Sequence, residues 1–254
     1  MLAERVGDSG LVIAMDRDPA ALAAAEQSLA GLPIKLVQAN YCELPEVLDQ
    51  LAIPGVHGVL LDLGLSSDQL ADGDRGFSFE LDGPLDLRFD PTEGEPAWRL
   101  LERLDADRLA DLIYQLGEER HSRRIARRIV EARRDAPVRM ARQLADLVRR
   151  SVPRTRDSQR IDPATRTFQA LRIAVNDELG SLEKALKQFP GCLLPGGRMV
   201  IIAFHSLEDR PVKESFRDDA RWHALTRKPI TASEAEIAAN PRSRSAKLRV
   251  AQKA

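Results

Sequence analysis

The sequence predicts an α/β fold in which a mostly parallel sheet is interrupted by an inserted helical subdomain. Short apolar runs alternate with helical stretches in the first 62 residues, which is the pattern of β-α-β units joined by right-handed crossovers. Apolar residues with helical spacing then fill residues 97–150, after which a helix and an apolar strand return. With 254 residues, 43% of them hydrophobic, the chain is long enough to bury a core under such a sheet.

The first segment is expected to contain three strands and two helices. The first strand follows a turn-forming run at residues 7–10, and the first helix begins with Asp18 as its N-cap and Pro19 as its first residue. The expected strands are residues 11–15, 34–37 and 59–61, and the expected helices are residues 20–29 and 43–51. Each strand is short and apolar, so a buried parallel arrangement is predicted.

The alternation breaks at residues 64–91, a connection rich in Ser, Asp and Gly. It is far longer than the usual two to six residues between a strand and a helix, which indicates a functional loop. The helical stretch that follows is predicted to be the inserted subdomain.

The sheet pattern resumes after Asp162-Pro163, expected as the N-cap and first residue of one helix whose apolar residues recur every three or four positions from Phe168 to Leu186. A strand at residues 199–204 and a final strand at residues 247–251, closing the sheet edge, complete the prediction. The chain is therefore divided into a first sheet segment, a helical subdomain and a second sheet segment: residues 1–94, 95–160 and 161–254.

Composition excludes several protein classes. The longest apolar run, residues 199–204, is far shorter than the roughly 20 residues that span a bilayer, and the N-terminus has no signal-peptide pattern. Two cysteines without CxxC spacing and only four histidines argue against a disulfide framework or a zinc site, so no metal is expected. A reducing, cytoplasmic compartment is predicted.

Charge is distributed unevenly along the chain. Residues 41–119 hold nineteen Asp and Glu against five Arg, whereas residues 120–160 hold fourteen Arg against four acidic residues. The basic segment fits a polyanionic partner, and the competing interpretation is a set of solvated helix faces.

Two carboxylates directly follow apolar strands, where doubly wound sheets bind their ligands. Asp16 is placed to accept hydrogen bonds from the hydroxyls of an adenosine ribose, the alternative being a helix cap, a role that Asp18 already fills. Asp62 opens the run Asp-Leu-Gly-Leu-Ser-Ser, in which Gly64 allows a ligand close to the backbone. Its alternative is an ordinary Asx turn.

Seven ordered motifs carry a family resemblance. They are DLGLSS at 62–67, RGFSF at 75–79, DGPLDLR at 82–88, GEER at 117–120, ATRTFQALRI at 164–173, PGGR at 195–198 and FHSLEDR at 204–210. Together they resemble the RsmH/MraW family of bacterial cytosine N4-methyltransferases of small-subunit ribosomal RNA. The resemblance implies a Rossmann-like class I methyltransferase sheet, S-adenosylmethionine as cofactor, and methylation of a cytidine in 16S ribosomal RNA within the small subunit. It also makes the helical subdomain an RNA-binding one.

The family's cofactor contacts fall on Asp16 for the ribose, Tyr41 beside the adenine, Asp62 near the methionine end and Gln69 in the following loop. The exocyclic amine of cytosine is a weak nucleophile, and acceptors for its N–H groups would localise its lone pair. We expect Asp62, Ser66 and Ser67 to supply them, although loop hydroxyls also serve as turn hydrogen-bond partners.

RNA contacts are expected from the arginines and from one histidine. Arg123, Arg124, Arg127 and Arg128 form two adjacent pairs one helical turn apart, which suits phosphates, and Arg149, Arg150, Arg154, Arg156 and Arg160 add to the segment. His205, at the end of the strand at 199–204, is expected to contact cytosine or phosphate, or else to serve a structural role. Phe77 and Phe79 either receive the splayed target base or anchor their loop in a core.

One departure from the family is expected to matter. The family begins with a strand and a glycine-rich segment of the type Asp-Gly-Thr-x-Gly-x-Gly-Gly-His-Ser, and this chain starts after it. The first, central strand is therefore expected to be missing from the sheet, with the true start upstream or with weak cofactor binding and low activity. Alternatives are a non-catalytic RNA-binding or ribosome-assembly protein, and a nicotinamide-dependent oxidoreductase, which would need a GxGxxG motif that is absent.

Overall fold

The computed structural model describes residues 2–7, 9–153 and 162–254. It consists of two compact units, one made of Met1–Gly64 with Leu179–Ala254 and the other of Leu65–Glu178. The expected helical subdomain, residues 95–160, falls inside the second unit, which also takes in the long connection before it and the helix after it. No helix in the described part of the chain is long and apolar enough to cross a membrane.

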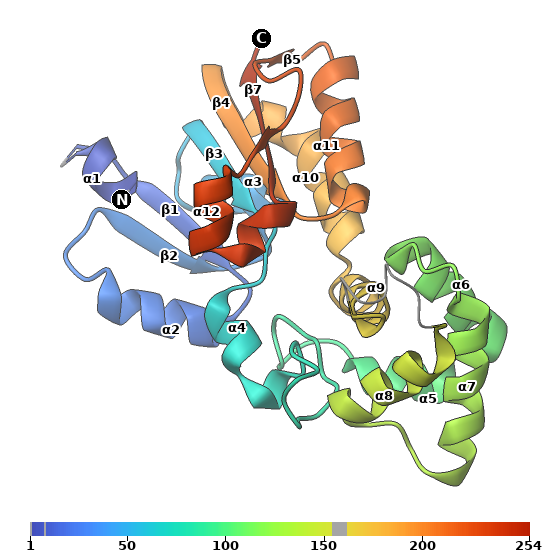
Figure 1. The fold of residues 1–254 in the computed structure, drawn as a ribbon. Helices are drawn as coiled ribbons and strands as arrows, with labels where there is room; N and C mark the ends of the chain where they lie inside the picture. Colours follow the sequence, from blue (N-terminus) through green and yellow to red (C-terminus); the bar gives the residue numbers. More distant parts are fainter. Residues whose placement is uncertain (1, 8, 154–161) are drawn as a thin grey trace. The chain divides into compact units, whose positions relative to one another are not determined.

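The first unit contains a β-α-β pair near its start (Figure 1). Strand β1 (Val12–Asp16) pairs in parallel with β2 (Ile34–Gln38), and α2 (Pro19–Ser28) connects them. The predicted cap is confirmed, because the Asp18 side chain accepts a hydrogen bond from the Ala20 N–H at 3.0 Å. The remaining elements of this stretch are α1 (Leu2–Val6), the 3-10 turn η1 (Tyr41–Glu43), α3 (Leu44–Gln50) and β3 (Val56–Asp62).

A second sheet has the strand order β3-β4-β7-β5, where β4 is Leu193–Ala203, β7 is Lys247–Lys253 and β5 is Trp222–Ala224. Strands β3 and β4 are parallel, whereas β7 runs antiparallel to β4. The expected final strand exists, but the prediction that it closes the sheet edge is wrong. After α11 (Ser206–Asp218), β5 and the short β6 (Ile230–Thr231) pair with the outer side of β7 and make it internal. The helices α12 (Glu234–Ala239) and η4 (Pro241–Ser245) precede β7.

The two sheets are not hydrogen-bonded to each other. Among the described residues, no strand pairs with β1 on the side away from β2, or with β3 on the side away from β4. The sheet is thus interrupted between β1 and β3 in the part of the chain that the structure describes. The interruption leaves backbone groups of both strands without ladder partners in the described structure.

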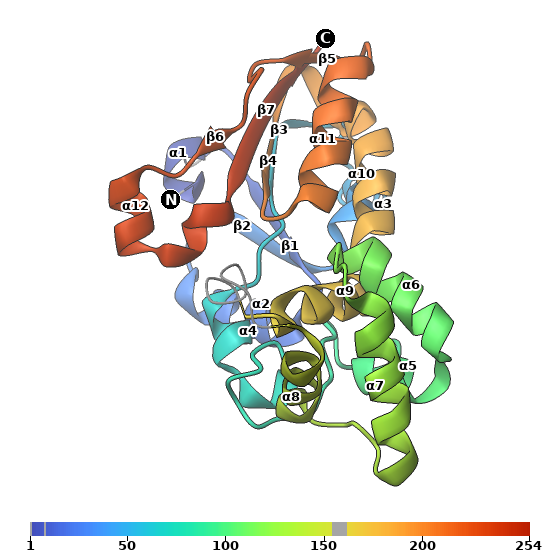
Figure 2. The same cartoon turned by 45° about the vertical axis from the view of Figure 1, so that its right-hand side comes forward.

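One face of the second sheet carries the core of this unit. Helices α3, α10 (Glu178–Cys192) and α11 cover that face (Figure 2), and Phe189, Met199 and Ile201 are almost fully buried there. Leu60 points to the opposite face of β3 and is 50% exposed. Strand β3 is therefore fully packed on one side only.

The second unit is a bundle of helices around its own core. Its longer helices are α5 (Ala97–Arg103), α6 (Ala106–Gly117), α7 (Ser122–Asp135), α8 (Ala141–Ser151) and α9 (Ala164–Asn176). The apolar stripe seen in the sequence lies inward: Leu109, Ile113, Ile125, Ile129 and Leu144 are fully buried.

The long connection at 64–91 is a packed part of this bundle. It contains α4 (Ser67–Ala71) and the 3-10 turn η2 (Gly73–Arg75). Leu85 and Leu87 are buried, Phe77 stacks on Phe89 with ring centroids 5.8 Å apart, and Phe79 meets Phe168 edge-on at 5.1 Å. The loop-anchor interpretation of the two phenylalanines is therefore confirmed.

The single helix expected from Phe168 to Leu186 is two helices, so that prediction is wrong. Asp177 adopts a left-handed conformation, φ 49°, and its N–H donates to the Ile173 carbonyl, which ends α9 before α10 begins. The expected helix start is shifted by one residue, because Pro163 takes the N-cap position. Asp162 still caps the helix, accepting from the Ala164 N–H at 2.8 Å.

Candidate active site

The two strand-end carboxylates predicted from the sequence lie at the carboxyl ends of β1 and β3. Asp16 is exposed, and one of its oxygens accepts the Asp18 N–H at 2.8 Å. Asp62 is also exposed, and its Oδ1 accepts the Gly64 N–H at 3.1 Å, so the Asx turn is present as well. A carboxylate has about four lone-pair sites, and the single turn bond of Asp62 leaves acceptor capacity for a ligand there.

Gly64 is required by the packing behind Asp62. The Leu63 N–H donates to the Ile202 carbonyl at 3.0 Å, which continues the β3–β4 pairing past the end of β3. A Cβ on Gly64 would lie 2.6 Å from Cε2 of the Phe204 ring, closer than real atoms approach. The ends of β3 and β4 are thus held together, with Asp62 and Phe204 beside the same glycine.

Tyr41 follows β2 and lies in η1, where it packs half-buried against the core of the first unit. The turn is fixed by a capping box between Asn40 and Glu43, and the Asn40 amide donates to the Ser181 hydroxyl at 2.8 Å. The aromatic ring is consequently carried on a well-anchored segment after the second strand.

The side chains at these strand ends are of the types that bind S-adenosylmethionine. Carboxylates accept hydrogen bonds from ribose hydroxyls and attract a sulfonium, and an aromatic ring suits the adenine. Asp16 and Asp62 are exposed at the carboxyl ends of parallel strands, and Tyr41 follows the strand between them in sequence. When bound, this cofactor supplies an electrophilic methyl group.

Ser66 and Gln69 form a helix cap at the start of α4. The Ser66 hydroxyl accepts the Gln69 N–H at 3.0 Å, and the Gln69 side-chain carbonyl accepts the Ser66 N–H at 3.1 Å. Ser67 is the exposed first residue of the helix. The Ser-x-x-Gln spacing is the sequence signature of a capping box and could have revealed this role.

A histidine and a buried glutamate meet at the corner between β4 and α11. His205 occupies the N-cap position of α11 with 12% of its side chain exposed, and its Nε2 lies 3.1 Å from Oε1 of Glu208. The other oxygen of Glu208 accepts the Phe204 N–H at 2.8 Å. Sequence reasoning chose His205 but missed Glu208, whose burial no local pattern reveals.

The arginines of the second unit fall into two groups. Arg123, Arg124 and Arg127 are exposed on α7 and form no ion pair or hydrogen bond in the described structure, whereas Arg128 pairs with Glu131 at 3.7 Å. Arg149 is part of the fold: it pairs with Asp162 at 2.7 Å and lies over the Phe79 ring. The hydrogen bond with Asp162 raises the pKa of Arg149. Arg150 is exposed, and Arg154, Arg156 and Arg160 lie outside the described residues.

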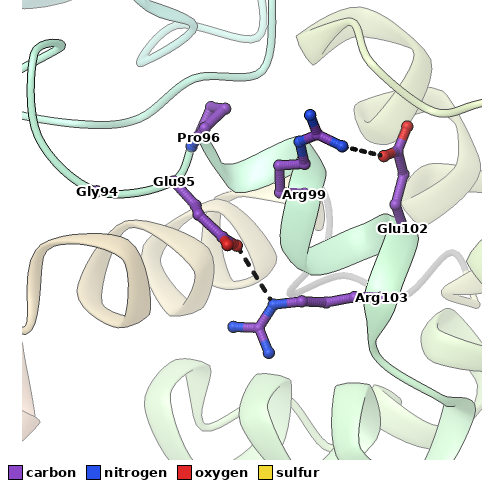
Figure 3. A pocket seen from close by; sticks show the side chains of 6 residues that line it. All are labelled: Gly94, Glu95, Pro96, Arg99, Glu102 and Arg103. Atoms are coloured by element: carbon purple, nitrogen blue, oxygen red, sulfur yellow. Dashed lines mark hydrogen bonds and ion pairs between the residues drawn. The ribbon is translucent and has the colours of Figure 1, made fainter.

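An open cavity of about 550 Å³ lies elsewhere in the second unit (Figure 3). Its lining includes two ion pairs, Arg103 with Glu95 at 3.4 Å and Arg99 with Glu102 at 3.5 Å. Each arginine is neutralised by a glutamate, and no residue predicted for the active site lines the cavity.

The carboxyl ends of parallel strands, where Asp16 and Asp62 lie, are the place at which Rossmann-like folds bind their ligands. Comparison with known proteins agrees. The MraW methylase family matches residues 2–254, and the chain belongs to this family. It is an S-adenosylmethionine-dependent methyltransferase.

Similar proteins from three organisms are each named "Ribosomal RNA small subunit methyltransferase H". The Rhodopirellula baltica protein is 52% identical over 264 residues, covering all of this chain and 81% of the relative. The Prochlorococcus marinus (strain MIT 9303) protein is 52% identical over 256 residues, covering all of this chain and 80% of the relative. The Deinococcus radiodurans protein is 49% identical over 250 residues, covering 98% of this chain and 78% of the relative.

Proposed function

We propose that this chain methylates the N4 amine of a cytidine in 16S ribosomal RNA of the small subunit. The observation that carries the proposal is similarity near 50% identity, over nearly the whole chain, to relatives named for ribosomal RNA methylation. A ribosomal substrate implies action in the cytoplasm, on RNA within the small subunit.

The sheet end supplies the residues for this chemistry. Asp16 is assigned to the ribose, Tyr41 to the adenine, and Asp62 to the methionine end of the cofactor and to the target amine. A carboxylate that accepts an N–H of the amine localises the nitrogen lone pair, and holding the amine in line with the methyl group lowers the barrier further. Ser66, Ser67 and Gln69 follow Asp62 in sequence, and the two serines are assigned to the target amine and Gln69 to the cofactor.

The helical segment 95–160 is assigned to RNA binding. Arg123, Arg124 and Arg127 support this assignment, because exposed guanidinium groups without protein partners remain available to phosphates. Arg128 is assigned to the same surface, since its exposed ion pair with Glu131 is weak enough to be exchanged for a phosphate. Contacts of this kind position the RNA and do not read its sequence.

Mass spectrometry of 16S ribosomal RNA tests the reaction. A strain lacking the gene should lose one N4-methylcytidine and regain it when this chain is expressed. Unchanged modification in the deletion strain would refute the assignment.

Calorimetry with S-adenosylmethionine separates an enzyme from a non-catalytic RNA-binding protein. The binding protein would release no heat when it is mixed with the cofactor.

The ribose role of Asp16 has its own test. Asp16→Ala should weaken S-adenosylmethionine binding by about 1.5–3 kcal/mol, the scale of hydrogen bonds to a charged group. Asp49→Ala, at another exposed carboxylate of the first unit, is the control and should bind as the wild type does. Equal affinity of the two variants would leave Asp16 as a turn residue only.

A further inference from the structure

The corner between β4 and α11 contains an imidazole, that of His205, whose ring nitrogens lack hydrogen-bond partners. Neither ring nitrogen of His205 has a hydrogen-bond partner among the described residues. The Nε2 atom lies 3.1 Å from Oε1 of Glu208, but the angles between the two groups do not suit a hydrogen bond. Polar side-chain atoms withdrawn from water are almost always hydrogen-bonded in native proteins, so an exception calls for a functional explanation. Glu208 itself is only 3% exposed.

Glu208 fixes the backbone beside this histidine and places a carboxylate next to its ring. Its Oε2 accepts the Phe204 N–H at 2.8 Å, which locks the backbone just before His205, and its Oε1 faces Nε2 of the imidazole. A carboxylate beside one ring nitrogen favours the tautomer that carries its proton there. The other nitrogen, Nδ1, is then a proton acceptor.

The pair lies at the same sheet end as Asp62. Asp62 is in register with Ile202, and His205 comes three residues after Ile202 on the neighbouring parallel strand. Extended chain advances about 3.3 Å per residue, so His205 lies roughly 10 Å along the strand direction beyond the level of Asp62. The ring of Phe204, the residue before His205, occupies the space that a Cβ on Gly64 would need.

The proposed reaction needs a proton acceptor at this place. When the N4 lone pair bonds to the methyl carbon, the carbon–sulfur bond breaks and its electron pair goes to sulfur. The nitrogen is then positively charged and carries one proton more than the neutral product. Removing that proton leaves the electron pair of the N–H bond on nitrogen.

We infer that Nδ1 of His205 accepts the proton released from N4, and that Glu208 is the positioning residue that sets the tautomer of the ring. The inference rests on the proposed function and assigns one further step of it. The imidazolium returns the proton to water after the product leaves. Histidine suits the step because a neutral imidazole has one ring nitrogen that can accept a proton.

Nuclear magnetic resonance tests the tautomer without cofactor or RNA. In the full chain labelled with ¹⁵N-histidine, the His205 signals are assigned by their loss in His205→Gln. We expect an unprotonated Nδ1 and a protonated Nε2 in the neutral ring, and loss of this preference in Glu208→Gln. A neutral His205 that carries its proton on Nδ1 would overturn the inference.

Kinetics on small subunits tests the step itself. His205→Gln should lower kcat about a hundredfold or more while the KM for RNA and the affinity for S-adenosylmethionine stay near wild-type values. Free imidazole should partly restore kcat in His205→Gly, which a structural role would not allow. The matched control is His223→Gln, at an exposed histidine on β5, and it should leave kcat unchanged.

The outcomes separate the two proposals. If the wild type methylates N4 but His205→Gln turns over at the wild-type rate, only the role of His205 fails. If cofactor and RNA bind yet the methyl group is found on another atom, the proposed function fails while the tautomer experiment still decides the state of His205.

Discussion

The helices of the second unit and the β1–β2 pair of the first unit bury their apolar residues to very different extents. In the helical bundle, Leu109, Ile113, Ile125, Ile129 and Leu144 are fully buried. In β1 and β2 no residue is buried, and Leu11, just before β1, is 51% exposed. A helix satisfies its own backbone and needs only one packed stripe, whereas a two-stranded sheet depends on neighbouring strands or helices for stability.

Each unit contains one tryptophan, Trp222 in the first and Trp98 in the second. A Trp98→Phe background therefore reports unfolding of the first unit by fluorescence, and a Trp222→Phe background reports unfolding of the second. The two regions can be compared in one chain.

The largest effect is expected at a buried ion cluster of the first unit. Asp209 on α11 accepts hydrogen bonds from Arg249 at 2.7 Å and from Lys247 at 3.2 Å, both on β7. Asp209→Asn should lower the free energy of unfolding by about 3–5 kcal/mol, because Arg249, 5% exposed, loses its charge partner. Urea unfolding in the Trp98→Phe background measures this change. A loss below about 1 kcal/mol would mean that the cluster behaves as a surface pair.

The same cluster predicts a dependence on pH. Burial raises the pKa of Asp209, but the hydrogen bonds from Arg249 and Lys247 outweigh it and lower the pKa below its ordinary value of 3.8. The stabilisation is therefore complete above that ordinary value and is lost as pH falls through the lowered pKa. The stability difference between wild type and Asp209→Asn should shrink only below about pH 4.

A matched pair of leucines tests the contrast in burial directly. Leu109→Ala, in the bundle core, should cost about 2–5 kcal/mol, whereas Leu36→Ala, at a half-buried position of β2, should cost about 1 kcal/mol. Urea unfolding in the two single-tryptophan backgrounds gives both values. Equal costs would show that β1–β2 is as tightly packed as the helices.

On the surface of the second unit, unpaired arginines should matter for RNA and not for stability. Replacing Arg123, Arg124 and Arg127 by Ala should weaken RNA binding. It should also reduce the slope of the logarithm of the binding constant against the logarithm of the salt concentration by up to about 0.7 for each lost contact with single-stranded RNA. The control is Arg217→Ala, which removes an exposed arginine of the first unit already paired with Asp218 at 2.6 Å. If all variants show the same salt dependence of RNA binding as the wild type, the arginines do not contact RNA and are solvated side chains.

The smallest expected effect has opposite signs at two positions of the second unit. Asp177 is exposed with φ 49°, so Asp177→Gly should raise the free energy of unfolding by about 0.5–1 kcal/mol. Asp111→Gly, at an exposed position inside α6, should lower it by about 1 kcal/mol because glycine is a poor helix former. Thermal unfolding in the Trp222→Phe background checks both, and stabilisation by both would contradict the backbone argument.

Local signals were enough to predict most elements. The strands β1, β2 and β3 and the N-cap at Asp18 follow from residues adjacent in sequence, because helix caps and short apolar runs between turn signals extend over a few positions. The carboxylates Asp16 and Asp62 were found for the same reason, since a strand end is visible in the sequence. The capping box of Ser66 and Gln69 was equally visible and was missed.

The remaining features depend on contacts between distant residues. The break at Asp177 has no glycine or proline to mark it, and the apolar spacing continues across it. Only strand pairing decided that β7 lies inside the sheet, and only packing decided that Leu85 and Leu87 are core residues of a polar-looking loop. The partners of Arg149, Glu208 and Asp209 were likewise decided by the tertiary structure. A charge in a sequence does not reveal its partner, because the free energy of a buried pair depends on which groups the fold brings within hydrogen-bonding distance.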